Sequence, residues 1–139
     1  MMKSFKILQT LIVMTFVLMT FVLISGCKPG LNIDNSAKED EQANLAKLMD
    51  EIIVLSKKVN CEDAKEWKFV PIGAKACGGP AGYISYSIKI NSDDFIKKVS
   101  TYTTESENFN KKWGITSDCS LVNPPKEVKC ENGKPVFVY

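Results

Sequence analysis

The sequence predicts an α+β fold in which two amphipathic helices pack on a small antiparallel sheet, stapled by two disulfides. Three observations predict it. Two segments carry apolar residues at helical spacings, several short runs are rich in β-branched and aromatic residues, and four cysteines follow an apolar N-terminal segment. The length of 139 residues leaves room for one domain rather than two.

The first helix is expected over residues 36–59. Ser36 and Glu39 form a capping-box pattern, and the acidic residues of the first turn suit the positive end of the helix dipole. Lys57 and Lys58 are expected in the last turn. Six apolar residues at spacings of three and four form one stripe that must be buried: Leu45, Leu48, Met49, Ile52, Leu55 and Val59.

Two strands are expected between the helices, at residues 67–72 and 83–90, because both runs are rich in aromatic and β-branched residues. Alternate residues of the second run are apolar, which indicates one buried face. This face contains Ile84, Tyr86, Ile88 and Ile90.

The second helix is the clearest element and is expected over residues 93–113, with Ser92 as N-cap and Gly114 as the stop signal. Its apolar stripe is expected to pack in the core rather than to bind an aromatic ligand. The stripe contains Phe95, Val99, Tyr102, Ser106, Phe109 and Trp113.

The C-terminal tail predicts a β-hairpin. Asn132-Gly133 separates two β-prone runs, 128–131 and 135–139, and both central residues of the favoured two-residue turn need a positive φ. Pro135 cannot donate a hydrogen bond to a neighbouring strand, so its strand is expected at an edge.

The first 27 residues have the order of a secretion signal: lysines, an apolar run over 7–24, then small residues before Cys27. The run Ile24-Ser25-Gly26-Cys27 resembles the lipobox of bacterial lipoprotein precursors. The resemblance implies that residues 1–26 are a cleaved signal peptide and that Cys27 carries a lipid such as a palmitate-containing diacylglyceryl group. Residues 27–35 then form a flexible tether to a globular domain at 36–139. The other interpretation is an uncleaved transmembrane helix, since 18 residues span about 27 Å.

Four runs of the later sequence resemble small uncharacterised lipoproteins of Gram-negative bacteria: residues 66–69, 71–73, 76–80 and 130–135. This resemblance implies no particular activity. In enteric lipoproteins an aspartate directly after the lipidated cysteine retains the protein at the inner membrane, whereas this chain has Lys28 there. The resemblance therefore implies the outer membrane, with the domain facing the periplasm or the cell surface.

The composition excludes several chemistries. All 18 basic residues are lysines and the chain has no histidine, so Ser-His-Asp and Cys-His nucleophiles, histidine zinc sites and arginine clamps are impossible. Without residues 1–26, the 16 remaining lysines balance 16 acidic residues. A neutral domain without arginine gives no reason to expect nucleic acid as a partner. We expect no cofactor and no metal.

Once Cys27 is assigned to the lipid, four cysteines remain in a chain that is expected to leave the cytoplasm, where two disulfides are the default. We expect Cys61 to pair with Cys77 and Cys119 with Cys130, because sequential pairing closes the shortest loops. The two other pairings stay open. A thiolate metal site is the weaker alternative, since no C-x-x-C spacing is present.

Residues 76–82 are unusually rich in glycine. They lack the Lys-Ser/Thr ending of a P-loop and open no helix, so a tight turn beside a disulfide is expected. Disulfide-braced loops also make good binding surfaces, and this gives a candidate recognition loop. Its candidate contact residues are Gly78, Gly79, Pro80, Gly82 and Tyr83.

The expected function is a membrane-anchored, non-enzymatic envelope module. It would bind a wall component or a protein, for example as an inhibitor of a secreted enzyme or an immunity factor. The alternative is a small histidine-independent hydrolase that acts on envelope glycans with two carboxylates. Candidate acids cluster at Glu62, Asp63 and Glu66, and again at Glu105 and Glu107, but the last two point about 200° apart on a helix. The sequence alone assigns no activity.

Overall fold

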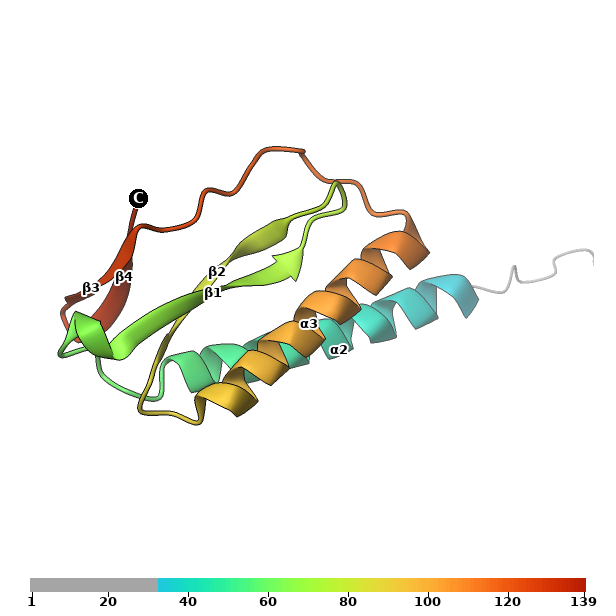
Figure 1. Cartoon of the computed structure of the whole chain (residues 1–139). Helices are drawn as coiled ribbons and strands as arrows, with labels where there is room; N and C mark the ends of the chain where they lie inside the picture. The colour runs from blue at the N-terminus through green and yellow to red at the C-terminus, as the bar shows by residue number, and fades with distance from the viewer. Residues whose placement is uncertain (1–32) are drawn as a thin grey trace, which may run out of the picture. The chain divides into compact units, whose positions relative to one another are not determined.

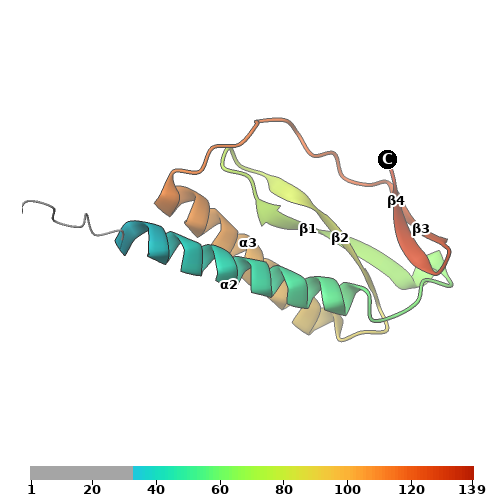
Figure 2. The same cartoon turned by 180° about the vertical axis from the view of Figure 1, so that it is seen from behind.

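The computed structural model describes residues 33–139, and the predicted signal segment and Cys27 lie outside them. Two long helices lie side by side on one face of a β-hairpin, as both views show (Figures 1 and 2). A second hairpin follows the second helix. The α+β fold class with two helices, antiparallel strands and two disulfides is therefore confirmed, with the strands divided between two two-stranded sheets.

The elements follow one another as helix, hairpin, helix, hairpin. In chain order they are α2 (Ile33–Ser56), a 3₁₀ turn η1 (Ala64–Glu66), β1 (Trp67–Ala74), β2 (Pro80–Ser87), α3 (Ser92–Trp113), β3 (Glu127–Glu131) and β4 (Lys134–Val138). Residues Asn35–Tyr139 form one compact unit. No helix in the described residues combines the length and the apolar character that crossing a bilayer requires.

Helix α2 begins at Ile33, three residues before the predicted start at Ser36, and ends at Ser56. The residue before this start in the sequence, Asn32, is of a type that often caps helices, so the sequence is compatible with more than one start. The predicted placement of Lys57 and Lys58 in the last helical turn is wrong. Both lie in the turn after the helix, where the Lys58 amide donates to the Leu55 carbonyl at 3.2 Å.

Helix α3 ends at Trp113 as predicted, but it begins at Ser92, one residue early, because its N-cap is Asn91 rather than Ser92. The Asn91 side chain accepts a hydrogen bond from the Asp94 amide, as an N-cap must. Gly114 ends the helix with φ 57°, a left-handed conformation that glycine adopts without strain.

The β1–β2 hairpin is antiparallel and its register runs from Trp67 opposite Ser87 to Ala74 opposite Pro80. The second strand therefore lies three residues earlier than the predicted 83–90. Ile88 and Ile90 have no strand partner because β1 begins at Trp67, and Ile88 is 47% exposed.

The C-terminal hairpin has the predicted turn. Asn132 and Gly133 have φ values of 51° and 74°, as the two-residue turn requires. Cys130 lies opposite Pro135 in the register of β3 and β4. Pro135 is on one of the two strands of this sheet, both of which are edge strands.

The helices and the first hairpin share the main core. Ile52 of α2, Ile72 of β1, Tyr86 of β2, and Phe95 and Val99 of α3 form one buried cluster. The Tyr86 and Phe95 rings stack with centroids 4.9 Å apart. This core fixes α3 against β1 and so determines which residues meet at the β1–β2 turn.

A second cluster joins the two hairpins. Cys61, Trp67 and Val128 are buried there, and Phe69 and Phe137 pack against them. The cluster anchors the C-terminal hairpin beside the start of β1, although the two sheets share no strand pairing.

The predicted disulfide pairing is wrong. Cys61 bonds to Cys130 and Cys77 to Cys119, so the two cross-links are nested rather than sequential. The reason is geometric. Cys61 and Cys77 lie beyond opposite ends of β1, whose eight residues extend about 26 Å, whereas disulfide-bonded Cα atoms lie within about 7 Å of each other.

Candidate functional site

The glycine-rich turn between β1 and β2 is the candidate site. The Gly78 amide donates to the Lys75 carbonyl at 2.9 Å, and the Lys75 amide donates to the Gly79 carbonyl at 3.0 Å. Gly78 and Gly79 have φ values of 96° and 79°, which only glycine adopts readily, so the tight turn requires them. Both are exposed at the tip.

Two connections tie this turn to the segment that follows α3. The first is the Cys77–Cys119 disulfide, which spans 42 residues of sequence. In both views the segment after α3 passes the tip of the β1–β2 hairpin on its way to β3 (Figures 1 and 2). The cross-link therefore holds the base of the loop against a segment that has no regular secondary structure of its own.

The second connection is the ammonium group of Lys75. Its Nζ donates to the Ser120 carbonyl at 2.7 Å, the Ser120 hydroxyl at 3.1 Å and an Asp118 carboxylate oxygen at 3.1 Å. The Lys75 side chain is only 15% exposed. Hydrogen bonds from Ser120 and Lys75 lower the pKa of the Asp118 carboxyl group. Lys75 is therefore a structural brace, not a free surface cation.

A cavity of about 510 Å³ lies between this loop and the C-terminal half of α3. On the α3 side, polar side chains of the cavity wall form hydrogen bonds with the hairpin backbone. Asn110 donates from Nδ2 to the Ala74 carbonyl at 2.8 Å, and the Gly73 amide donates to the Thr103 hydroxyl oxygen at 3.0 Å.

Gly73 explains why the hairpin can approach α3 so closely. A Cβ at this position would lie 3.1 Å from the Ala81 Cβ and 3.3 Å from Tyr102 Cε1. The residue also has a φ of 69°. Any side chain would therefore strain the backbone and push the turn away from the helix.

The structure divides the five candidate recognition residues. Gly78, Gly79 and Pro80 line the cavity beside the loop. Gly82 lies within β2 opposite Ile72, and Tyr83 packs its ring edge-on against Phe69 with centroids 6.0 Å apart. Tyr83 therefore belongs to the aromatic packing between the two hairpins rather than to the loop.

Sequence reasoning missed the residues that brace the loop from a distance. Lys75 and Asp118 are 43 positions apart, and Asn110 is 36 positions from Ala74. No spacing pattern links residues so far apart. The cysteines are the one sequence signal for this contact. A Cys77–Cys119 bond would place Lys75, close to Cys77, beside Asp118, close to Cys119.

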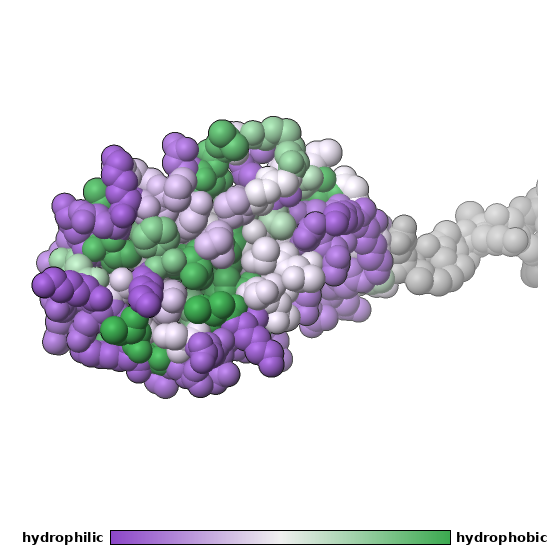
Figure 3. Space-filling view, in the orientation of Figure 1, coloured by the Kyte–Doolittle hydropathy of each residue, from purple (hydrophilic) through white to green (hydrophobic). Residues whose placement is uncertain are grey.

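Charged side chains at the nearby ends of α2 and α3 are paired with one another. Hydrophilic residues cover the end of the molecule where α2 begins and α3 ends (Figure 3). There Glu41 of α2 pairs with Lys112, and it accepts a hydrogen bond at 2.8 Å from the indole nitrogen of Trp113. Lys111 pairs with Glu107 at 2.7 Å on α3.

The carboxylates considered for a hydrolase lie on different elements and have different partners. Asp63 caps η1 by accepting from the Lys65 amide at 2.9 Å, and Glu66 pairs with Lys89. Glu107, by contrast, lies on α3 beside the glycine-rich turn. Three carboxyl groups in the described part have a clearly shifted pKa, and it is lowered in each: Glu41, Glu51 and Asp118.

Within residues 33–139, no three histidine, cysteine or acidic side chains gather in a group that could hold a metal ion. The chain matches no protein-family model, no curated protein and no solved structure.

Proposed function

We propose that this chain is a membrane-anchored envelope lipoprotein whose domain is a non-enzymatic binding module. Its contact surface is the braced loop at Gly78 and Gly79, and its partner is a protein or a wall component. The observation that carries the proposal is the contrast within the loop. The tip is exposed, while its base is held by the Cys77–Cys119 disulfide and by the Lys75 side chain, which is only 15% exposed.

Such a loop suits recognition for a physical reason. A loop that is already ordered loses little conformational entropy on binding, so more of the contact energy appears as affinity. A Cβ built on Gly78 or Gly79 would meet no atom within 4 Å, so the space beyond the tip is open. The backbone of a partner can therefore approach closely.

The charges near the loop favour a neutral, hydrogen-bonded contact over an ionic one. Lys75 and Lys111, the two lysines that line the cavity, are each paired with a carboxylate, Asp118 and Glu107 respectively. The exposed Lys111–Glu107 pair is a weak obstacle, but the Lys75 side chain is only 15% exposed and also bonds Ser120, so a partner recognised mainly by its own charge would have to displace this brace. Peptide backbone and sugar hydroxyl groups are the matching chemistry.

Three carboxyl groups are poorly suited to be the general acid of a hydrolase. A glycoside hydrolase needs a carboxylic acid whose pKa is raised so that it can donate a proton near neutral pH. Hydrogen bonds lower the pKa of Glu41 (from Lys112 and Trp113), Glu51 (from Lys98) and Asp118 (from Ser120 and Lys75) and favour their ionised forms.

The proposed anchor ties the domain to a membrane. In this proposal Cys27 carries the lipid, and Lys28 after it favours the outer membrane. Only five residues separate Cys27 from the start of α2 at Ile33, and five extended residues span at most about 18 Å.

Site-specific photo-crosslinking tests the binding function. A photoreactive residue replaces exposed Ala76 in the loop of the full chain, and the matched control carries it at exposed Asn44 on α2. After irradiation of intact envelopes, we expect one discrete adduct from Ala76 and none from Asn44. Substituting Cys77 and Cys119 by alanine should remove the adduct, because the loop then loses its brace.

Equal adducts from both positions, or none, would contradict the proposed contact surface. Turnover of a wall glycan by the purified chain, lost on changing one of its carboxylates to the amide, would establish the hydrolase instead.

A further inference from the structure

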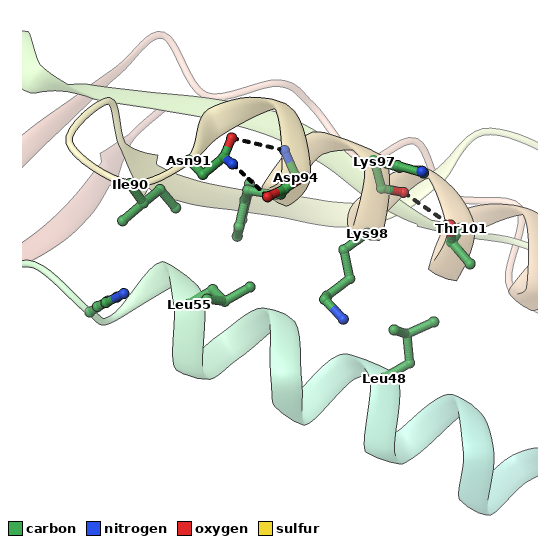
Figure 4. Close-up of a pocket in the computed structure, with 10 residues that line it drawn as sticks. Leu48, Leu55, Ile90, Asn91, Asp94, Lys97, Lys98 and Thr101 are labelled. Atoms are coloured by element: carbon green, nitrogen blue, oxygen red, sulfur yellow. Dashed lines mark hydrogen bonds between the residues drawn. The ribbon is translucent and has the colours of Figure 1, made fainter.

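A second concave surface lies between α2 and the first half of α3, away from the glycine-rich turn. It is a groove of about 510 Å³. Leu48 and Leu55 of α2 point into it from one side, and Ile90 lies at its end (Figure 4). Phe95, only 1% exposed, closes the floor. Sites for small molecules are usually concave, mainly apolar and between about 300 and 1,000 Å³ in volume.

The rim of this groove is cationic. Three lysines line it, Lys58, Lys97 and Lys98, against a single carboxylate, Asp94. The Asp94 carboxylate already accepts a hydrogen bond from the Asn91 side chain (Figure 4). Lys58 and Lys97 form no ion pair with any other described residue. The groove therefore combines an apolar floor with an excess of positive charge at its edge.

Lys98 crosses the groove. Its side chain extends from α3 toward α2 between Leu48 and Leu55 (Figure 4). Its Nζ donates to a Glu51 carboxylate oxygen at 2.7 Å, and the two side chains are 34% and 45% exposed. Ion pairs this exposed contribute little to stability, so another anion can replace Glu51 at small cost.

We infer that this groove binds a single-chain amphiphile with an anionic head group, of the long-chain fatty acid class. The hydrocarbon chain extends from Lys98 past Leu55 and over Phe95 toward Ile90. The carboxylate head takes the place of Glu51 at the Lys98 ammonium group. An acidic amphipathic helix fits less well, because a helix about 10 Å wide must first displace the Lys98 side chain that crosses the groove.

Photoaffinity labelling of the full chain in zwitterionic phosphatidylcholine vesicles tests this inference. The probe is a diazirine-bearing palmitic acid, and the matched control probe is the corresponding diazirine-bearing fatty alcohol. Trypsin cleaves after lysine, so the groove is represented by peptides 48–57 and 90–97, while the glycine-rich turn lies in peptide 76–89. We expect the acid to label 48–57 and 90–97 well above 76–89, and the alcohol to label them about tenfold less.

Two substitutions probe the head-group contact in opposite directions. Lys98→Met keeps the apolar stem but removes the charge, and should reduce labelling of both groove peptides by about tenfold. Glu51→Gln frees Lys98 and should increase the labelling. The matched control is Lys112→Met, which breaks the ion pair between α3 and Glu41 of α2 outside this groove and should leave labelling unchanged.

Equal labelling of the groove peptides by the acid and the alcohol would overturn the inference. So would labelling of peptide 76–89 that is as strong as that of 48–57 and 90–97. Competition by an acidic amphipathic peptide at a lower concentration than palmitate would assign the groove to a protein helix instead. Should Lys98→Met fail to fold, judged by circular dichroism, the increase expected for Glu51→Gln still decides the question.

Discussion

Replacing Cys61 and Cys130 by alanine should lower the free energy of unfolding by about 3.5 kcal/mol through the lost cross-link alone. The two disulfides are nested, with sequence separations of 69 and 42 residues. While the inner bond is intact, the outer bond closes only the 27 residues by which these separations differ. The chain-entropy relation for that loop gives about 12 cal/mol/K, or about 3.5 kcal/mol at 25 °C.

Burial adds to this loss. Cys61 is 3% exposed and packs in the cluster with Trp67 and Val128. Removing a buried group the size of a methylene costs about 0.8 kcal/mol, so the double variant should lose between 4 and 5 kcal/mol, roughly. The exposed Cys77–Cys119 bond carries no such packing, and its removal should cost about 3 kcal/mol. A small domain has a total stability of about 5 to 15 kcal/mol, so the difference is measurable.

Urea unfolding of the unit Asn35–Tyr139, followed by far-UV circular dichroism, measures both losses. A tryptic map without reduction checks the pairing, and it should join peptide 59–65 to 130–139 and peptide 76–89 to 113–126. The reasoning is refuted if the Cys77 and Cys119 variant is the less stable one. A map that joins 59–65 to 76–89 would refute the nested pairing itself.

Three further predictions concern the anchor, the core and the loop. Cys27→Ala should abolish metabolic labelling with palmitate and move the chain to the soluble fraction, and persistent labelling would disprove the lipid site. Phe95→Ala should cost about 3 to 5 kcal/mol in urea unfolding, because the ring is 1% exposed, whereas Ile96→Ala at 42% exposure should cost far less. The Asp118 carboxyl group should titrate below the ordinary aspartate pKa of about 3.9, and Ser120→Ala should raise its pKa in an NMR titration, since the Ser120 hydrogen bond is the largest cause of the shift. Because the pKa of Asp118 is lowered in the folded state, the contribution of this group to stability is present above about pH 4 and is lost as the pH falls through the folded pKa. An Asp118 titration midpoint that is unchanged in Ser120→Ala would contradict the brace.

Local signals predicted the helices and the turns well. The alternating spacings of three and four from Phe95 to Trp113 and the glycine at 114 located α3 to within one residue at its start and correctly at its end, because helix periodicity and capping involve neighbours in sequence. Asn132-Gly133 located the second hairpin for the same reason. The start of α2 was less well determined, since several residues near it can serve as a cap.

The position of β2 and the brace of the candidate site depended on distant parts of the chain. Strand β2 ends at Ser87 because β1 offers no partner beyond Trp67, although the alternation of Ile88 and Ile90 continues. Lys75 has no local feature that separates it from the other lysines. Its role follows from its hydrogen bonds to Asp118 and Ser120, which lie in the segment after α3.

The sequence by itself determined the fold class, the four cysteines that form the two disulfides, and the exclusion of histidine and arginine chemistry. These follow from composition and short-range periodicity, which need no knowledge of which segments meet. The tertiary structure decided the disulfide partners, the bracing of the glycine-rich turn and the cationic groove between the helices. Each of these depends on which residues 30 or more positions apart are brought together when the core around Phe95 and Ile52 closes.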